Sequence, residues 1–151
     1  MVIMRSEMMK RLLTALISIN LFATILSWIS YTPSSQREHN VYYFGFLETF
    51  MFVFLYAGPV YLLVGLPLSF IIDKLIGKTK SNSKLTRYFI GLGLYSFVGT
   101  LVGFIFVILL GQNVYWSEII SFSIYGFIAS NFYYHLSLLL SKINNKYLIF
   151  S

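Results

Sequence analysis

Residues 73–87 read Asp-Lys-Leu-Ile-Gly-Lys-Thr-Lys-Ser-Asn-Ser-Lys-Leu-Thr-Arg, and a long apolar run lies on each side of them. This segment holds five of the eleven Lys and Arg residues of the chain. Clustered Lys and Arg side chains are unfavourable to translocate, so a short basic loop between hydrophobic spans stays on the cytoplasmic side of a membrane. A cytoplasmic loop at 73–87 then sets the direction of every apolar run in the chain.

The composition points to lipid rather than water as the surrounding solvent. Of the 151 residues, 58% are hydrophobic and only 11% are charged, and the mean hydropathy is +0.76. A soluble domain of this length has about 25% charged residues. Too few polar side chains are present to cover a water-facing surface, and we expect a single transmembrane domain over residues 1–151.

The formal net charge of +6 is concentrated in the basic loop and the two tails, where membrane topology requires it. We therefore expect no nucleic acid as a partner. The expected partner is the anionic inner leaflet of the bilayer, which attracts basic residues near its surface. The residues expected to contact lipid headgroups are Lys74, Lys78, Lys80, Lys84 and Arg87. The chain has no Cys, which excludes disulfides and thiolate metal sites, and no metal or cofactor is expected.

Four apolar runs predict an all-α bundle of four transmembrane helices, at about 12–31, 42–72, 88–110 and 118–140. The second run is about 46 Å long as a straight helix, against a hydrocarbon core of about 30 Å. We therefore expect it to be tilted or kinked. Pro59 and Pro67 are the candidate kinks, because proline lacks a backbone N–H and its ring clashes with the carbonyl four residues back.

The charge distribution predicts that both termini are cytoplasmic in a multi-pass protein of the cell membrane. With this topology, Arg37 is the lone basic residue outside. The ten on the cytoplasmic side are Arg5, Lys10, Arg11, Lys74, Lys78, Lys80, Lys84, Arg87, Lys142 and Lys146. An asymmetry of this size agrees with the positive-inside rule.

The third run carries a stripe of small residues, Gly91, Gly99 and Gly103, in which Gly99 and Gly103 form a GxxxG pattern. Small residues four apart let a second helix approach closely. Packing against another helix of the same chain is the favoured interpretation. Packing in a homodimer and a chance occurrence remain the alternatives.

The fourth run is polar on much of its surface. Asn131 and His135 are four apart and share a helix face, and Ser130 lies on a second polar line. Hydrogen bonding between helices is the favoured interpretation. The alternative is a polar path or a proton-handling site through Asn131 and His135, because ionisable groups within a bilayer are costly and are functional candidates.

Two carboxylates, Glu48 and Glu118, lie near the outer ends of the second and fourth runs. Counted from the inner boundaries at Ile72 and Leu140, they are about 36 Å and about 33 Å away along straight helices. Both are expected to be interfacial. Glu48 remains a candidate polar group within the membrane, since kinks in the second run would bring it closer to the membrane interior.

Residues 65–74, Gly-Leu-Pro-Leu-Ser-Phe-Ile-Ile-Asp-Lys, close the second run. This segment resembles a stretch found in small uncharacterised four-span membrane proteins of Bacillus-type bacteria. The size of the chain, its number of spans and its basic central loop are similar as well. The resemblance implies the fold and the membrane location, and no activity.

No catalytic motif is present in the sequence: there is no HExxH, Walker loop or GxSxG. The favoured hypothesis is an accessory protein that acts by helix packing against a membrane protein partner or a second copy. A small oligomeric transporter or channel, with a polar path along the second and fourth spans, is the alternative. A membrane enzyme acting on lipid or envelope precursors is the third hypothesis, with Glu48 and Glu118 as its only acidic pair.

Overall fold

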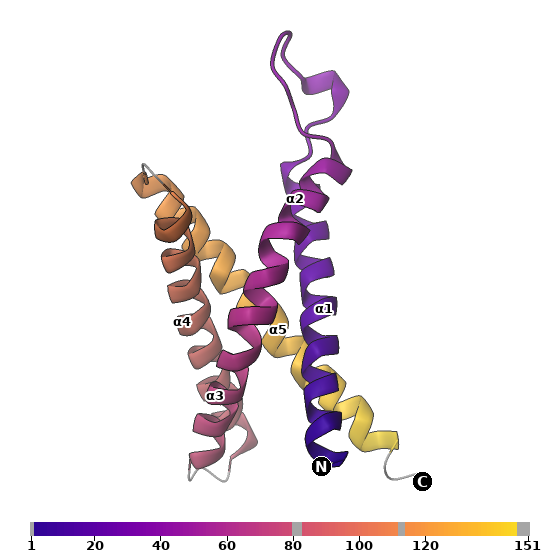
Figure 1. The fold of residues 1–151 in the computed structure, drawn as a ribbon, viewed down its shortest axis with the longest axis vertical. Coiled ribbons are helices and arrows are strands. Elements are labelled where there is room, and N and C mark those ends of the chain that lie inside the picture. Colours follow the sequence, from indigo (N-terminus) through magenta and orange to yellow (C-terminus); the bar gives the residue numbers. More distant parts are fainter. Residues whose placement is uncertain (1, 80–82, 112–113, 148–151) are drawn as a thin grey trace.

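The computed structural model describes the backbone of residues 2–79, 83–111 and 114–147, and the side chains of 2–6 and 143–147 are outside that description. The described chain is helical and has no strand (Figure 1). The elements in order are α1 (Val2–Ser30), η1 (Ser34–Gln36), α2 (Phe46–Pro59), η2 (Val60–Gly65), α3 (Leu66–Lys78), α4 (Lys84–Leu110) and α5 (Trp116–Tyr147).

Three helical segments are long and apolar enough to cross a membrane: Glu7–Ser30, Phe46–Lys78 and Lys84–Leu110. The described chain is therefore all-helical, and three of its segments suggest a membrane protein. Helix α5 is 32 residues long, yet it is not among the three. Its serines, together with Asn131 and His135, lower its hydropathy.

Much of the described part of the basic segment 73–87 is helical. Helix α3 continues through Asp73 to Lys78, and α4 begins at Lys84. Lysine is a good helix former, and a cation in the last turn of α3 is favoured by the helix dipole. Lys80 lies outside the described residues.

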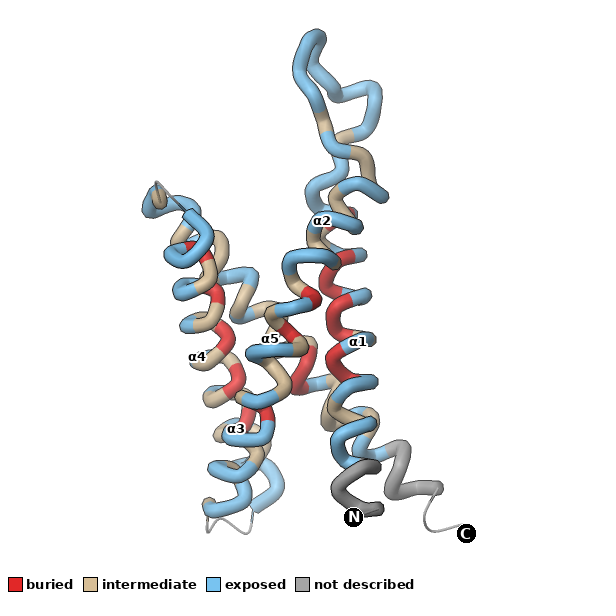
Figure 2. Tube along the Cα trace, in the orientation of Figure 1, coloured by how far each residue is buried: buried red, intermediate tan, exposed pale blue. Residues whose placement is uncertain are grey.

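The helices form two antiparallel pairs that diverge like a V (Figure 1). Helix α1 packs along α2, and α4 packs along α5. The far half of α5 crosses to α1, and α3 meets α4, so the two pairs contact each other through these helices. The buried residues lie on the faces that the helices turn toward one another (Figure 2).

Helix α4 uses its glycine stripe to hold α5. Gly91, Gly99 and Gly103 are all buried, as are Tyr95 and Val107 on the same face. A Cβ added at Gly99 would meet Ser130 and the backbone of Gly126, and one at Gly103 would meet the backbone of Phe122. The stripe therefore packs within the chain, and α5 covers the face on which a homodimer was the alternative.

Helix α1 packs through a face of small side chains that composition alone did not reveal. Thr14, Ala15, Ser18, Ala23 and Ser27 are each at most 2% exposed. Three of these residues carry hydroxyls, and each donates to the carbonyl four residues earlier on α1. This satisfies the polar groups inside the helix and leaves a flat surface for close approach.

The two prolines expected to kink the second span flank a change in helix type. Between Pro59 and Pro67 the backbone widens into the six-residue π-helix η2, and the N–H of Leu66 donates to the carbonyl of Tyr61. A wider turn accommodates a proline that has no N–H to offer and whose ring crowds the preceding turn. The helix stays continuous from Phe46 to Lys78.

Candidate functional site: a polar layer between two cavities

Five side chains from four helices meet near the junction of the two helix pairs. We call this cluster the polar layer; its members are Arg11 on α1, Ser69 and Asp73 on α3, Tyr95 on α4 and Tyr133 on α5. Ser69, Tyr95 and Tyr133 are buried. The cluster includes an ion pair between two different helices, formed by Arg11 and Asp73.

An ion pair lies at the centre of the polar layer. Arg11 Nη1 is 2.7 Å from Asp73 Oδ2, and the same nitrogen donates to Ser69 Oγ at 2.9 Å. The hydroxyl of Tyr95 donates to Asp73 Oδ1 at 3.1 Å. The hydroxyl of Tyr133 donates to Ser69 Oγ at 3.2 Å. Hydrogen bonds to charged groups are the stronger kind, so this network ties all four long helical segments together.

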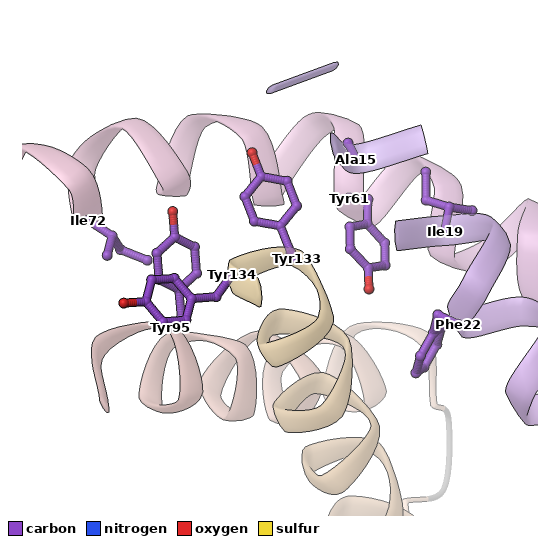
Figure 3. Packing of buried hydrophobic residues seen from close by; sticks show 8 residues of the cluster. All are labelled: Ala15, Ile19, Phe22, Tyr61, Ile72, Tyr95, Tyr133 and Tyr134. Carbon is purple, nitrogen blue, oxygen red and sulfur yellow. The ribbon is translucent and has the colours of Figure 1, made fainter. Parts of the chain in front are cut away.

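Asp73 and Ser69 are placed by helical spacing, since residues four apart on α3 lie on one face. Tyr95 is held by ring stacking, with its ring centroid 5.0 Å from that of Tyr134 and 6.0 Å from that of Tyr133. Figure 3 shows these tyrosines gathered beside Ile72, between the helices. The aromatic stack fixes the hydroxyl of Tyr95 against the carboxylate.

Arg11 is nearly buried: its side chain is 18% exposed, and its guanidinium lies 4.2 Å from the centre of the Phe70 ring. Its Nε is the one buried side-chain nitrogen or oxygen in the described chain without a hydrogen-bond partner. Buried donors in native proteins nearly always have partners, and an exception calls for a water or an ion.

On one side of the polar layer lies an apolar cleft of about 610 Å³ between the two helix pairs. Ser69, Tyr95 and Tyr133 belong to its lining, and the other lining groups are almost all apolar. Tyr61 closes it toward α1, donating to the carbonyl of Ala129 at 2.8 Å and meeting the Phe22 ring edge-on (Figure 3). The two facing walls include Phe52, Tyr56 and Val60 on the α2 side and Val98, Val102 and Phe106 on α4.

On the other side lies a smaller cavity of about 460 Å³, which we call the basic vestibule. Charged residues from the ends of three helices line it: Glu7, Lys10 and Arg11 from α1, Asp73 from α3, and Lys84 and Arg87 from α4. Helix α5 closes it with Tyr134, Ser137, Leu138, Leu140 and Ser141. The polar layer thus separates an apolar compartment from a charged one.

Asn131 and His135 line neither cavity. Asn131 bonds across the α4–α5 interface to Ser96, with its Nδ2 donating at 3.0 Å, which is the hydrogen bonding between helices that was favoured. His135 is exposed and contacts the rings of Tyr88 and Tyr134. Ser130 lies at the cleft and donates to the carbonyl of Phe127.

Glu48 and Glu118 each cap the start of their own helix. Glu48 is exposed and accepts from the N–H of Gly45 and the hydroxyl of Tyr42. Glu48 raises the pKa of Tyr42, mainly because it accepts the hydrogen bond from the Tyr42 hydroxyl and secondly because of its negative charge. Glu118 accepts from the N–H of Tyr115. Carboxylates at helix starts are the ordinary use of these residues, and neither touches the polar layer.

The basic residues expected at lipid headgroups separate into two groups. Lys74 and Lys78 are exposed on α3 and do not line the vestibule, whereas Lys84 and Arg87 do. No three His, Asp or Glu side chains in the described chain come together as a metal site.

The sequence interpretation missed the polar layer. Arg11 was counted only as a topology charge, Asp73 only as a member of the basic segment, and Tyr133 had no assigned role. The available signal was Asp73, the one carboxylate in the basic segment 73–87. A single acid beside two apolar runs predicts a cationic partner from another helix end.

Comparison with family models, curated proteins and solved structures found no match to this chain. The function is therefore inferred from the site itself.

Proposed function

We propose that the chain is a four-span protein of the cell membrane whose termini and α3–α4 connection are cytoplasmic. Three segments supply apolar spans, and α5 is a fourth helix of sufficient length that lies against α4 along the glycine stripe. The four long helical segments α1, α2–α3, α4 and α5 alternate in direction (Figure 1), and the basic residues gather at one end of them. Likeness to small four-span proteins of Bacillus-type bacteria remains part of this proposal.

The proposed function is binding of a lipid-like apolar molecule in the apolar cleft. The observation that carries it is the cleft itself: about 610 Å³ of space with almost wholly apolar walls, between helices of membrane type. Ligand sites have volumes of about 300–1,000 Å³ and are mostly apolar with a few polar groups that fix orientation. Tyr61, Tyr133 and Ser69 are those polar groups here.

The accessory-protein and membrane-enzyme hypotheses each depend on particular residues. Helix packing against a partner was expected to use the glycine stripe, which α5 already covers. An accessory protein would then have to bind its partner through the cleft or through an outer helix face. A membrane enzyme was expected to use Glu48 and Glu118, and both accept helix-start N–H groups. The cleft favours ligand binding over both.

Native mass spectrometry of the full-length protein, with phosphatidylcholine added in detergent, tests this function. Wild type is expected to retain phosphatidylcholine. Val102→Phe fills the cleft and is expected to lose it, because Val102 lines the cleft. Leu101→Phe is the matched control, an exposed neighbour on α4 outside the lining.

Equal retention by both variants, or none by wild type, would overturn the proposal. A dimer mass that Val102→Phe abolishes would instead assign the cleft to a second copy and favour helix packing.

A further inference from the structure

The apolar cleft is lined by no charged side chain among the residues that the structure describes. A charge at hydrocarbon depth in a membrane is costly unless it is paired. The described lining offers no partner to a charged headgroup, so the part of a ligand that enters the cleft is uncharged. The hydroxyls of the lining then decide which uncharged polar group fits.

Five of the seven hydroxyl-bearing side chains in the lining already donate within the protein. These five are Tyr61, Ser69, Tyr95, Ser130 and Tyr133. The other two, Tyr56 and Tyr125, donate to no described residue. They are also accessible, being 59% and 39% exposed. Tyr56 and Tyr125 are therefore the hydroxyl donors of the described lining that a ligand can reach.

Tyr56 and Tyr125 lie at a similar level on walls that belong to different helix pairs, since Tyr56 is on α2 and Tyr125 on α5. The hydrogen bond from Tyr61 to the carbonyl of Ala129 joins these walls and gives a reference point. Tyr56 is five residues before Tyr61 and Tyr125 is four before Ala129, which is about 6–8 Å along each helix. Both steps run toward the starts of α2 and α5, which lie at the open end of the V (Figure 1).

Both tyrosines are far from the ends of their helices. Tyr56 is ten residues after Phe46, where α2 begins, and Tyr125 is nine after Trp116, where α5 begins. In the proposed topology this is about 14–15 Å, half of a hydrocarbon core of about 30 Å. Tyrosine is usually enriched at the membrane surface, where water satisfies its hydroxyl. At this depth, acceptor oxygens of a ligand would satisfy the two hydroxyls instead.

The lining is also rich in aromatic rings: nine of its 25 residues are aromatic, against 19% of the whole chain. Tyr125 belongs to a row of rings, with its centroid 5.9 Å from that of Phe122, which is 6.0 Å from that of Phe106. Aromatic side chains contact other planar rings by stacking or edge-on. A planar ring with acceptor oxygens and an apolar tail therefore matches this lining.

We propose that the apolar cleft binds a lipid quinone, a planar ring that carries two carbonyl oxygens and an isoprenoid tail. Tyr56 and Tyr125 donate to the ring carbonyls, and the tail lies along apolar lining such as Leu68 and Val98. The ring is uncharged, and its carbonyl oxygens accept the two hydrogen bonds that the protein leaves unused. This inference rests on the function proposed for the cleft and names the class of its ligand.

The test is competition in native mass spectrometry between phylloquinone and the dimethyl ether of its reduced form, with full-length protein in detergent. The two probes share their ring and tail, but the ether oxygens are poor acceptors. Wild type is expected to prefer phylloquinone. Tyr56→Phe and Tyr125→Phe are each expected to lower that preference about fivefold, the effect of one hydrogen bond of about 1 kcal/mol. Tyr115→Phe is the matched control, an exposed tyrosine outside the lining, and is expected to keep the preference.

Neither Tyr56→Phe nor Tyr125→Phe removes a hydrogen bond within the described chain, so both are expected to keep the thermal stability of wild type. Equal retention of the two probes by wild type, or an unchanged preference in both variants, would overturn the quinone assignment. An equal loss in Tyr115→Phe would also overturn it. Retention of phosphatidylcholine that Val102→Phe abolishes reports on the cleft itself. The function of the cleft stands if only the quinone preference fails, and both proposals fall if wild type retains no lipid.

Discussion

The guanidinium of Arg11 lies 2.7 Å from the carboxylate of Asp73, and this pair joins the first helix to the end of the third. The pair is only partly exposed: the side chains of Arg11 and Asp73 are 18% and 42% accessible. An ion pair in such a place is weak evidence for stability by itself, but the loss of one partner leaves a costly uncompensated charge. The arrangement of the four helical segments therefore depends on keeping both charges or neither.

Asp73→Asn is expected to lower the free energy of unfolding by about 1–3 kcal/mol, below the value for a fully buried pair because Asp73 is partly solvated. Thermal unfolding of the purified protein in detergent measures this. The exchange Arg11→Asp with Asp73→Arg is expected to recover part of the loss. Glu7→Gln is the control, since it breaks an exposed pair with Lys10 and is expected to change stability by less than about 1 kcal/mol. An equal effect of Asp73→Asn and Glu7→Gln would contradict a special role for the Arg11 pair.

The glycine stripe of α4 is expected to tolerate no side chain where it meets α5. Gly99→Ala and Gly103→Ala each place a Cβ against α5 backbone, so the helices must separate. We expect each to destabilise by about 1–3 kcal/mol, the range for overpacking. Gly93→Ala is the control, because nothing lies within 4 Å of its added Cβ and alanine favours helix by about 1 kcal/mol. Thermal unfolding of all three variants decides the question, and a stable Gly103→Ala would show that α4 and α5 are not in this contact.

The tyrosine hydroxyls of the polar layer differ in what they support. Tyr95→Phe removes a donor to the carboxylate of Asp73, whereas Tyr133→Phe removes a donor to Ser69, which still accepts from Arg11. Bonds to charged groups contribute about 1.5–3 kcal/mol and neutral ones about 0.5–1.5. Tyr95→Phe is therefore expected to be the more destabilising in thermal unfolding. In the Asp73→Asn background its effect is expected to shrink, and an unchanged effect would mean that the hydroxyl of Tyr95 contributes independently of the charge on Asp73.

Hydropathy and glycine spacing predicted the helical membrane fold and the packing face of α4 because both depend on local pattern. The helix that holds Asp73 continues to Lys78, within the basic segment, since charged residues at a membrane surface remain good helix formers. The polar layer was missed because its members come from four helices, and no local period relates Arg11 to Tyr133. The small-residue face of α1 was hidden because its hydroxyls are satisfied within the helix.

The number of membrane crossings can be read with single cysteines, because the chain has no Cys of its own. Ser35→Cys places a thiol before α2, and Ser117→Cys places one at the start of α5. Lys78→Cys places one at the end of α3, and Ser141→Cys places one in the last turns of α5. All four positions are exposed. With cytoplasmic termini and four spans, a membrane-impermeant maleimide is expected to label Ser35→Cys and Ser117→Cys in intact cells. It is expected to label the other two only after permeabilisation. Labelling of Ser117→Cys and Ser141→Cys from the same side would mean that α5 does not cross, so that its polar residues face water and only three spans remain.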